Sequence, residues 1–331
     1  MSCRFLLTGA SGFVGGHIAE ALVQRGWPVS AIVRPSSDTS LLKKLNVNLI
    51  VGELGDAKLI SEAVADADVV INAAAKVGDW GPVEDYRAVN VEQLRVLLDA
   101  CKGQALERFI HVSSLGVYEG RHHYGTDETV PPPARHSDGY TQTKVESEQL
   151  VLRYYRDFEV PVVVLRPGFV YGSRDRTVLP RIIENLKKHE VRYPGGGHAA
   201  MNTIFVLNFV HALLLALDNP QAIGQIYNLT DGEFVSKRQF IESICDALGL
   251  DKPAGKPPLW LAKIVTWISE KRARWRGAKE APRFTFAKLK FMGYNLDFSI
   301  EKAKRELGYL PRFTFKEGMY ETMAYYKQNS P

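Results

Sequence analysis

Two residues with acid–base side chains, Tyr140 and Lys144, stand four positions apart in the stretch GYTQTKVE (139–146). A spacing of four puts both side chains on one face of a helix. An ammonium held near a phenol favours the phenolate by Coulomb attraction, and so lowers a pKa that is about 10 in free tyrosine. Such a pair could give a proton to an alkoxide near neutral pH. Because Tyr and Lys are common on helix surfaces, the surrounding elements must decide between chemistry and a plain surface helix.

Glycines follow the first apolar run of the chain. The stretch LLTGASGFVGGH places Gly9, Gly12 and Gly15 between a predicted strand over 4–9 and a predicted helix over 12–26. Glycines at such a junction allow a tight turn and a close approach of the backbone to a pyrophosphate, which then faces the helix N-terminus. The spacing is one residue longer than G-x-G-x-x-G. Placed after the first strand, it predicts a dinucleotide site.

The second predicted strand ends at Arg34, in the stretch RPSS (34–37). Folds that prefer NAD commonly carry an acidic residue there, which binds a ribose hydroxyl. Arg34 and the Ser37 hydroxyl instead suit a 2′-phosphate, because a guanidinium forms charge-assisted and often bidentate hydrogen bonds with phosphate. The residues favour NADP(H) over NAD(H) as cofactor. A solvated arginine at the strand end is the alternative.

Short apolar runs alternate with longer amphipathic stretches through the first half of the chain. Continuously apolar strands, each followed by a helix, predict a parallel sheet that is covered on both faces. Ligands bind such a sheet at the carboxyl ends of its strands, so functional residues should follow strands. The predicted strands are 4–9, 29–34, 47–54, 68–75, 108–114 and 160–168, and the predicted helices are 12–26, 56–67, 84–101 and one from about 138.

The fold class expected from this order is α/β, a Rossmann-type doubly wound parallel sheet with a smaller, mostly helical C-terminal substrate lobe. Residues 1–172 are expected to form the dinucleotide-binding domain, and 200–230 to return to it. Beyond residue 172 loops interrupt the alternation, so 173–331 are expected to form mainly the substrate-binding lobe.

Composition narrows the classes of function. The chain has 331 residues, 45% hydrophobic and 24% charged, with a net charge of +5 spread along its length. This charge suits an anionic cofactor, and the sequence has no zinc-finger spacing or aromatic-interleaved basic repeat, so no nucleic acid is expected as a partner. Three scattered cysteines indicate reduced thiols, and no metal site is expected, the pair His122–His123 included. Without an apolar run of about 18 residues, a cytoplasmic protein is expected.

Several stretches taken together resemble the extended short-chain dehydrogenase/reductase family, of NAD-dependent epimerase/dehydratase type. They include TGASGFVG (8–15), VSSLGVY (112–118), YTQTK (140–144) and LRPGFVYG (165–172). Two further stretches look most like the 3β-hydroxysteroid dehydrogenase branch, which includes sterol-decarboxylating dehydrogenases and 2-alkyl-3-oxoalkanoate reductases. These are AAKVGDWGPVEDYRAVNVEQ (74–93) and FVLNFVHALLLAL (205–217).

The resemblance implies a role for each matching residue. Tyr140 corresponds to the catalytic acid/base, Lys144 to its partner and Ser114 to the serine that hydrogen-bonds the substrate oxygen. Glu53 stands where the family commonly has Asp at the adenine. The positions implied for cofactor binding are Gly9, Ser11, Gly12, Phe13, Val14, Gly15, Arg34, Ser37, Glu53, Leu54, Ala73, Ala74, Ala75, Tyr140, Lys144, Pro167, Gly168 and Val170.

Residues in loops after strands are the candidates for substrate contacts. Aromatic side chains with polar tips suit a largely apolar carbonyl or alcohol, although ordinary loop aromatics would look the same. A Pro-rich loop leads into the catalytic helix, with Ser137 or Asp138 as its expected N-cap. The candidates are Lys76, Asp79, Trp80, Ser114, Tyr118, His123 and Tyr171.

The stretch PPLWLAKIVTWISEKRARWRG (257–277) combines an apolar first part, three tryptophans and a basic end. Such a helix can lie on an anionic membrane surface, which would make the protein peripherally membrane-associated and its substrate lipid-like. The alternative is a lid helix that packs its apolar face on the lobe or the substrate. Helices over 84–101 and 138–158 could form a homodimer contact.

These observations favour an NAD(P)-dependent oxidoreductase that interconverts a secondary alcohol and a ketone on a bulky apolar substrate, of steroid, sterol or 3-oxoacyl type. A nucleotide-sugar epimerase or dehydratase is the alternative, because epimerases share the Tyr and Lys. A non-catalytic nucleotide-binding regulator is a third hypothesis, disfavoured because such relatives usually lose the Tyr or the Lys.

Overall fold

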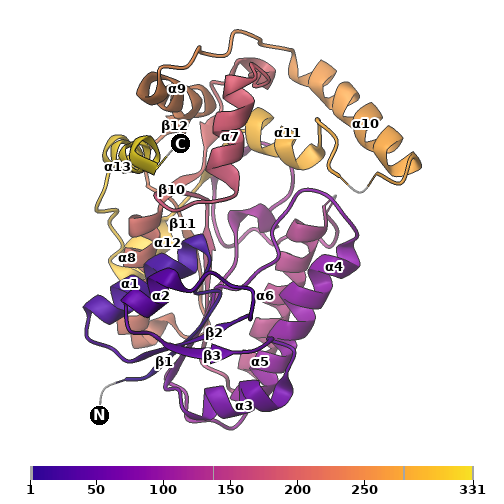
Figure 1. The fold of residues 1–331 in the computed structure, drawn as a ribbon. Coiled ribbons are helices and arrows are strands. Elements are labelled where there is room, and N and C mark those ends of the chain that lie inside the picture. The colour runs from indigo at the N-terminus through magenta and orange to yellow at the C-terminus, as the bar shows by residue number, and fades with distance from the viewer. Residues whose placement is uncertain (1–2, 137, 279, 330–331) are drawn as a thin grey trace.

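The computed structural model describes residues 3–136, 138–278 and 280–329 (Figure 1). A seven-stranded sheet forms its centre, and every pair of neighbouring strands in it runs parallel. Six of its strands come from the alternating apolar runs of the first half, so the predicted fold class is confirmed. In spatial order the strands are β11 (Ile226–Leu229), β7 (Val162–Pro167), β5 (Arg108–Val112), β4 (Val69–Asn72), β1 (Phe5–Thr8), β2 (Val29–Val33) and β3 (Asn48–Val51).

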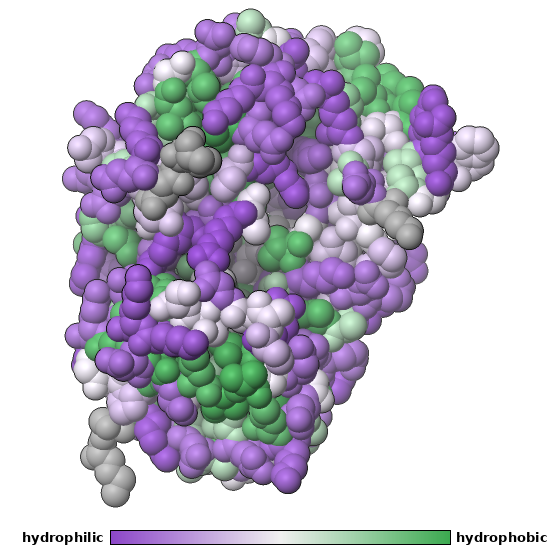
Figure 2. All heavy atoms as spheres, in the orientation of Figure 1, coloured by the Kyte–Doolittle hydropathy of each residue, from purple (hydrophilic) through white to green (hydrophobic). Residues whose placement is uncertain are grey.

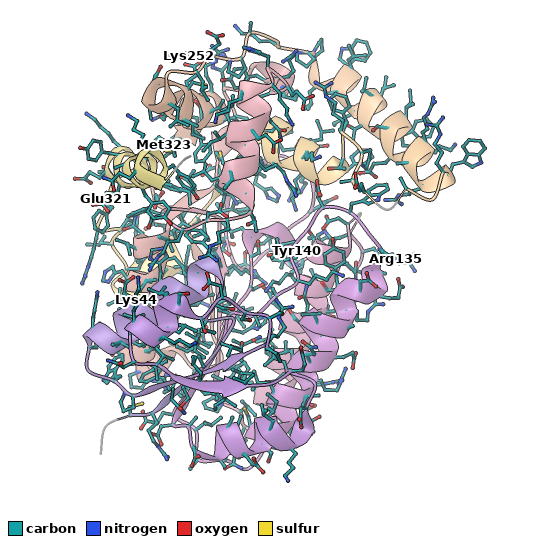
Figure 3. The ribbon with its side chains drawn as sticks, in the orientation of Figure 1. Lys44, Arg135, Tyr140, Lys252, Glu321 and Met323 are labelled. Atoms are coloured by element: carbon teal, nitrogen blue, oxygen red, sulfur yellow. The ribbon has the colours of Figure 1, made fainter. Side chains whose placement is uncertain are left out.

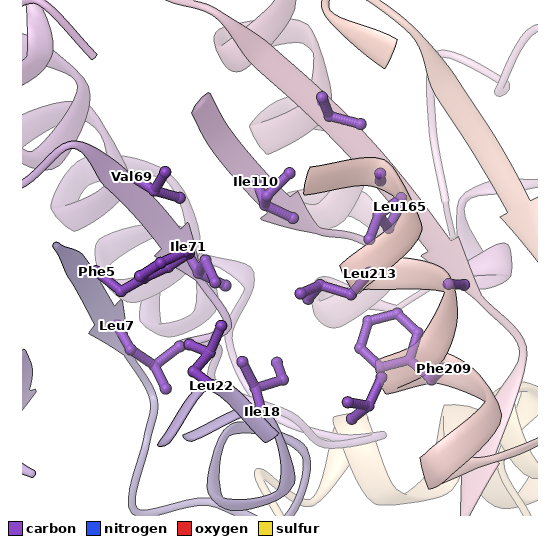
Figure 4. Close-up of a cluster of buried hydrophobic side chains, with 14 of the residues drawn as sticks. Phe5, Leu7, Ile18, Leu22, Val69, Ile71, Ile110, Leu165, Phe209 and Leu213 are labelled. Carbon is purple, nitrogen blue, oxygen red and sulfur yellow. The ribbon is translucent and has the colours of Figure 1, made fainter. Parts of the chain in front are cut away.

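Helices cover both faces of the sheet, because its central strands are apolar on both sides. On one face Ile18 and Leu22 pack against Phe209 and Leu213 in the cluster drawn in Figure 4. This face is covered by α1 (Phe13–Gln24), α2 (Ser40–Lys44), α8 (Val206–Asp218) and α12 (Glu301–Leu307). The other face is covered by α3 (Ala57–Ala65), α5 (Leu94–Cys101) and α6 (Gly139–Phe158).

The predicted helix over 84–101 is three segments in the structure: α4 (Val83–Arg87), a π-helical turn over Ala88–Gln93, and α5. A π-turn inserts an extra residue into a helix and occurs often at functional sites. The side chain of Asn90 points out of this turn and holds the backbone of Lys76 on both sides. Its Oδ1 accepts from Lys76 N at 2.7 Å, and its Nδ2 donates to Lys76 O at 3.1 Å.

The later residues build the part of the molecule beyond the carboxyl edge of the sheet. Three two-stranded pairings join segments far apart in the chain: β8 with β10, β9 with β12, and β6 with β13. These short strands are β6 (His123–Thr126), β8 (Phe169–Tyr171), β9 (Ala200–Met201), β10 (Thr203–Phe205), β12 (Val235–Ser236) and β13 (Leu296–Phe298). The helices here are α7 (Val178–Lys187), α9 (Lys237–Leu248), α10 (Leu259–Trp275), α11 (Phe286–Gly293) and α13 (Phe315–Asn329), with 3₁₀ turns at Leu115–Val117, Pro194–Gly196 and Pro220–Ala222.

Strand β11 and helix α8 lie with the sheet although they come late in the chain, since β11 pairs with β7 and α8 packs beside α1. The division into two domains at residue 172 stays a prediction. Among the helices that the structure describes, none is long and apolar enough to cross a membrane.

Candidate active site

The glycine turn between β1 and α1 is a cradle that side chains would fill. Gly9 has φ of +72°, and a Cβ built there would lie 2.7 Å from the backbone of Ala73. A Cβ on Gly15 would lie 2.1 Å from Gly9 O. With Gly12 as N-cap, the first N–H groups of α1 face this turn without a capping side chain. An N-terminus of this kind attracts a phosphate, so the turn fits the pyrophosphate of a dinucleotide.

The backbone beside the glycine turn is fixed from the neighbouring strand. The Thr8 hydroxyl donates to Asn72 Oδ1 at 2.6 Å and accepts from Ala74 N at 3.3 Å. Ala73, Ala74 and Ala75, the residues predicted to line the nucleotide cleft after the fourth strand, are each half-buried there. These hydrogen bonds hold the carboxyl ends of β1 and β4 next to each other.

The residues expected at the adenosine end follow β2 and β3. Arg34 and Glu53 are exposed, while Ser37 and Leu54 are half-buried. A turn joins Arg34 to Ser37, since Ser37 N donates to Arg34 O at 3.0 Å. In the part of the chain that the structure describes, no hydrogen bond or ion pair engages the Arg34 guanidinium, which follows β2 close in sequence to the Ser37 hydroxyl.

The start of α6 brings Tyr140 to the carboxyl edge of the sheet (Figure 3). The expected N-cap Asp138 is confirmed, because its Oδ1 accepts from Thr141 N at 2.8 Å; Ser137 lies outside the described residues. Ser114 caps the 3₁₀ turn that follows β5, and its Oγ accepts from Gly116 N at 3.0 Å. A hydrogen bond joins the Ser114 and Tyr140 side chains. The structure thus places two of the three predicted catalytic residues, Ser114 and Tyr140, in contact.

The electrostatics of Tyr140 differ from the sequence-based expectation. Burial raises the pKa of its phenol to about 12, the hydrogen bond with Ser114 opposes the shift, and Asp138 adds to it. Lys144 is absent from these causes, so the expected lowering by its ammonium is wrong for this arrangement. The reason is its position: Lys144 Nζ donates to Val112 O at 2.8 Å, and burial lowers the pKa of the amine to about 8, against the charge of Glu148.

A buried ion pair lies behind Ser114 and Lys144. Glu148, one helical turn after Lys144, pairs with Arg166 of β7 at 2.6 Å and accepts from the hydroxyl of Ser113. Arg166 Nη1 also donates to Tyr118 OH at 2.9 Å. The ion pair ties α6 to β7 and to the strand end that carries Ser114.

The sequence analysis did not predict this ion pair, nor the two hydrogen bonds between Asn90 and the backbone of Lys76. A charged residue within the apolar run VVVLRP (162–167) was the available signal, since a charge is rarely buried without a partner. Glu148, four residues after Lys144, was the candidate partner within the predicted helix.

Two of the predicted substrate residues, Asp79 and Trp80, form hydrogen bonds with the C-terminal elements. Trp80 Nε1 donates to Ala278 O at 2.8 Å. Asp79 Oδ2 accepts from Thr285 Oγ1 at 3.3 Å and lies 3.6 Å from Lys288 Nζ. The loop after β4 thus meets the segment between α10 and α11, and one side of the cleft is bridged there. Lys76, in contrast, pairs with Asp85 at the surface.

Three predicted substrate residues are turned into the protein, and the prediction is wrong for them. Tyr118 is 0% exposed, and its hydroxyl lies within hydrogen-bond distance of two acceptors, Asp127 O and Asn228 Oδ1. His123 is held between Glu119 O and Thr126 Oγ1. Tyr171 is 0% exposed in an aromatic core. Only Tyr118 lies after a strand as expected, because His123 begins β6 and Tyr171 ends β8.

The segment expected at the nicotinamide follows β7 directly. Pro167 is buried, and Gly168 and Val170 are half-buried at the edge that faces the C-terminal elements. The ring of Phe169 contacts Phe291 of α11 with 4.9 Å between centroids. Helix α11 therefore lies against this segment. Among the described residues no group of three metal-ligating side chains occurs, and Cys3, Cys101 and Cys245 are free.

Comparison with known sequences identifies this architecture. Residues 5–230 match the NAD dependent epimerase/dehydratase family. The chain belongs to this family. The family, of extended short-chain dehydrogenase/reductase type, was predicted from the sequence and is confirmed, and it makes the protein an enzyme of an NAD-dependent class.

Relatives in the family carry out both of the reaction types considered. A 4-hydroxy-2-methyl-3-oxo-4-farnesyl-3,4-dihydroquinoline-1-oxide ketoreductase of Stigmatella aurantiaca is 31% identical, over 96% of this chain and 94% of its own. A 3-beta-hydroxysteroid dehydrogenase of Mycolicibacterium neoaurum is 30% identical, over 98% and 91%. The structure of a UDP-glucuronic acid 4-epimerase from Bacillus cereus with UDP-glucuronic acid and NAD has a TM-score of 0.77 at 25% identity, covering 98% and 99%.

Proposed function

We propose that this family member is an NADP(H)-dependent oxidoreductase that interconverts a secondary alcohol and a ketone on a bulky apolar substrate. The observation that carries the proposal is the hydrogen-bonded pair Ser114–Tyr140, with Lys144 one turn further along α6, at the sheet edge that the glycine turn shares. The ketoreductase and the steroid dehydrogenase among its relatives act on farnesylated and steroidal molecules by name, which supports the apolar substrate class.

In the proposed mechanism Tyr140 gives a proton to the substrate oxygen in the direction of reduction. Its pKa of about 12 keeps the phenol protonated at neutral pH, as a proton donor requires. Ser114 Oγ accepts from Gly116 N, and its one hydroxyl hydrogen, which the hydrogen bond with Tyr140 uses here, would turn to the same substrate oxygen. When bound, the nicotinamide cofactor supplies the hydride. Lys144 lies one turn further along α6, with its amine held by Val112 O.

We propose that the glycine turn holds the cofactor through Gly9, Ser11, Gly12 and the first residues of α1. Arg34 and Ser37 are proposed to bind a 2′-phosphate, because a free guanidinium and a hydroxyl end β2 where an NAD-preferring fold would carry a carboxylate.

Helix α10 supports a contact with an anionic membrane. Most of its apolar side chains are exposed and do not pack on the lobe, while the alternative of a lid that packs them on the substrate stays open. Trp260 is 64% exposed and Trp267 53%, and the hydrophobic colour gathers at this helix in the upper right of Figure 2. Its last turns and C-cap carry Lys271, Arg272, Arg274 and Arg276. An apolar face beside cations suits anionic headgroups, and a lipid-like substrate would fit such a location.

The experiment that tests the proposed function measures NADPH and NADH consumption with steroid ketones, 3-oxoacyl compounds and nucleotide sugars. We expect turnover with apolar ketones and a preference for NADPH. Turnover with nucleotide sugars alone would overturn the proposed substrate class in favour of the epimerase hypothesis, for which the UDP-glucuronic acid 4-epimerase structure is the support.

A further inference from the structure

Helix α11 reaches from the C-terminal part of the chain to the turn that carries Ser114. The helix begins after Thr285, whose hydroxyl accepts from Lys288 N at 3.2 Å. One turn later Lys290 Nζ donates to Gly116 O at 2.8 Å and to Tyr118 O at 2.7 Å. Both acceptors belong to the 3₁₀ turn after β5 and its C-cap. A side chain 176 positions after Ser114 in the chain therefore holds the turn that Ser114 begins.

The turn is held from within by backbone hydrogen bonds from Val117 N to Ser114 O at 3.2 Å and from Tyr118 N to Leu115 O at 3.3 Å. It is three residues long, and the hydrogen bond from Gly116 N to Ser114 Oγ orients the serine hydroxyl. The peptide groups of Gly116 thus serve both side chains: its N–H binds Ser114, and its C=O binds Lys290. A shift of this residue would move the Ser114 hydroxyl with it.

The Lys290 ammonium is held in a place that is unfavourable for a charge. Within the described part of the chain, no carboxylate forms an ion pair or hydrogen bond with it, and its acceptors are the two carbonyls. Burial lowers the pKa of Lys290 to about 8, although the charge of Asp138 opposes the shift. A neutral side chain would avoid this desolvation, so surface solubility does not explain a lysine here.

We propose that Lys290 is a positioning residue, which fixes the Ser114–Tyr118 turn and so aims the Ser114 hydroxyl at the substrate oxygen. The inference rests on the proposed function, in which Ser114 is the hydrogen-bond donor. It makes α11 part of the active site, and the segment just before α11 is in turn bound by Trp80 through Ala278 O.

The test compares Lys290→Met with Lys316→Met, which removes the same charge from an exposed position on α13. A misplacement of about 1 Å at a reacting group can lower turnover about 10²-fold. We expect Lys290→Met to lower kcat about 10- to 100-fold, with the KM for cofactor unchanged. Lys316→Met should keep wild-type kinetics. A kcat for Lys290→Met within about twofold of wild type would overturn the proposal.

A second variant and a second readout separate positioning from folding. Lys290→Gln keeps a donor without the charge, and it should recover part of the kcat lost in Lys290→Met. Amide hydrogen exchange over residues 115–118 should accelerate in Lys290→Met and not in Lys316→Met, whatever the substrate; unchanged exchange there would contradict the proposal. If Tyr140→Phe retains full turnover, the proposed function fails, whereas Lys290 alone is refuted if Tyr140→Phe is inactive and Lys290→Met is not.

Discussion

The phenol of Tyr140 is a weaker acid in this site than a tyrosine phenol is in water. Burial raises the pKa of Tyr140 to about 12, and the hydrogen bond with Ser114 offsets only part of the shift. The phenol is therefore held as a proton donor at neutral pH, and donation to an alkoxide becomes favourable when the reacting oxygen takes on negative charge. Lys144, whose pKa is lowered to about 8 by the same burial, is oriented by Val112 O. Reduction needs no prior ionisation of either group.

Tyr140→Phe removes the proposed proton donor and leaves the aromatic ring in place. Loss of a positioned proton donor typically lowers a rate about 10²–10⁴-fold. We expect ketone reduction to fall by that factor, while NADPH binding, followed by fluorescence titration, stays at the wild-type affinity. Turnover close to the wild-type rate would remove Tyr140 from the mechanism.

The second prediction concerns Arg34, which is exposed at the end of β2. A hydrogen bond to a charged group contributes about 1.5–3 kcal/mol, or about 10- to 100-fold in affinity. Arg34→Ala should lower kcat/KM for NADPH by about that factor and leave kcat/KM for NADH nearly unchanged. Equal losses with both cofactors would mean that Arg34 does not read the 2′-phosphate.

At the scale of elements, the junctions between strands and helices set the site. The β1–α1 turn closes only if Gly15 has no side chain, because a Cβ there would overlap Gly9 O at 2.1 Å. The α6–β7 contact carries the ion pair of Glu148 with Arg166, whose side chains are 3% and 2% exposed. Each junction yields a prediction with a matched control elsewhere in the chain.

Gly15→Ala should prevent the tight turn and abolish cofactor binding. Overpacking of this kind destabilises a protein by about 1–3 kcal/mol, so the thermal unfolding temperature should fall as well. The control is Gly55→Ala, because a Cβ there meets nothing within 4 Å. Cofactor titration and thermal unfolding of both variants measure the difference; wild-type affinity in Gly15→Ala would show that the cradle is looser than described.

Glu148→Gln should destabilise the fold by about 3–5 kcal/mol, because it leaves the buried Arg166 guanidinium without its counter-charge. Glu146→Gln, on the same helix, removes a half-exposed pair with Arg87 and should cost less than about 1 kcal/mol. Urea denaturation of the two variants provides the comparison. Equal losses would indicate that water reaches Arg166.

The sequence predicts the sheet well and the later elements poorly, for a physical reason. Apolar strands followed by amphipathic helices carry their own periodicity, so β1 to β5 and the glycine turn were found from local pattern. Strand β6 exists because His123 pairs with Leu296, far along the chain, and no local pattern contains that partner. The same cause buried Tyr118, since its hydroxyl is satisfied by Asn228. Ser114 and Tyr140 were predicted because their motifs resemble those of the family and because Tyr140 and Lys144 stand four residues apart.

In the whole molecule, α10 projects an apolar and basic face away from the body (Figure 1). The homodimer contact expected at residues 84–101 and 138–158 stays a prediction. We expect sedimentation with liposomes that contain anionic lipid and weak sedimentation with neutral liposomes. Replacing Trp260 and Trp267 by Gln should reduce the bound fraction, because both tryptophans are more than half exposed. Unchanged partitioning of the double variant would remove the membrane proposal; kinetics with a short, soluble ketone provide the control for folding.

The return of β11 to the sheet has a consequence for how the chain reaches its fold. Val162, Val163, Val164 and Leu165 of β7 are all 0% exposed, and β7 has β11 as its outer neighbour. Until residues 226–229 leave the ribosome, that neighbour is missing and an apolar edge is open to pairing with another chain. A fragment cut at residue 172 would keep this open edge permanently. We expect such a fragment of residues 1–172 to aggregate on its own, which sedimentation of the expressed fragment would measure.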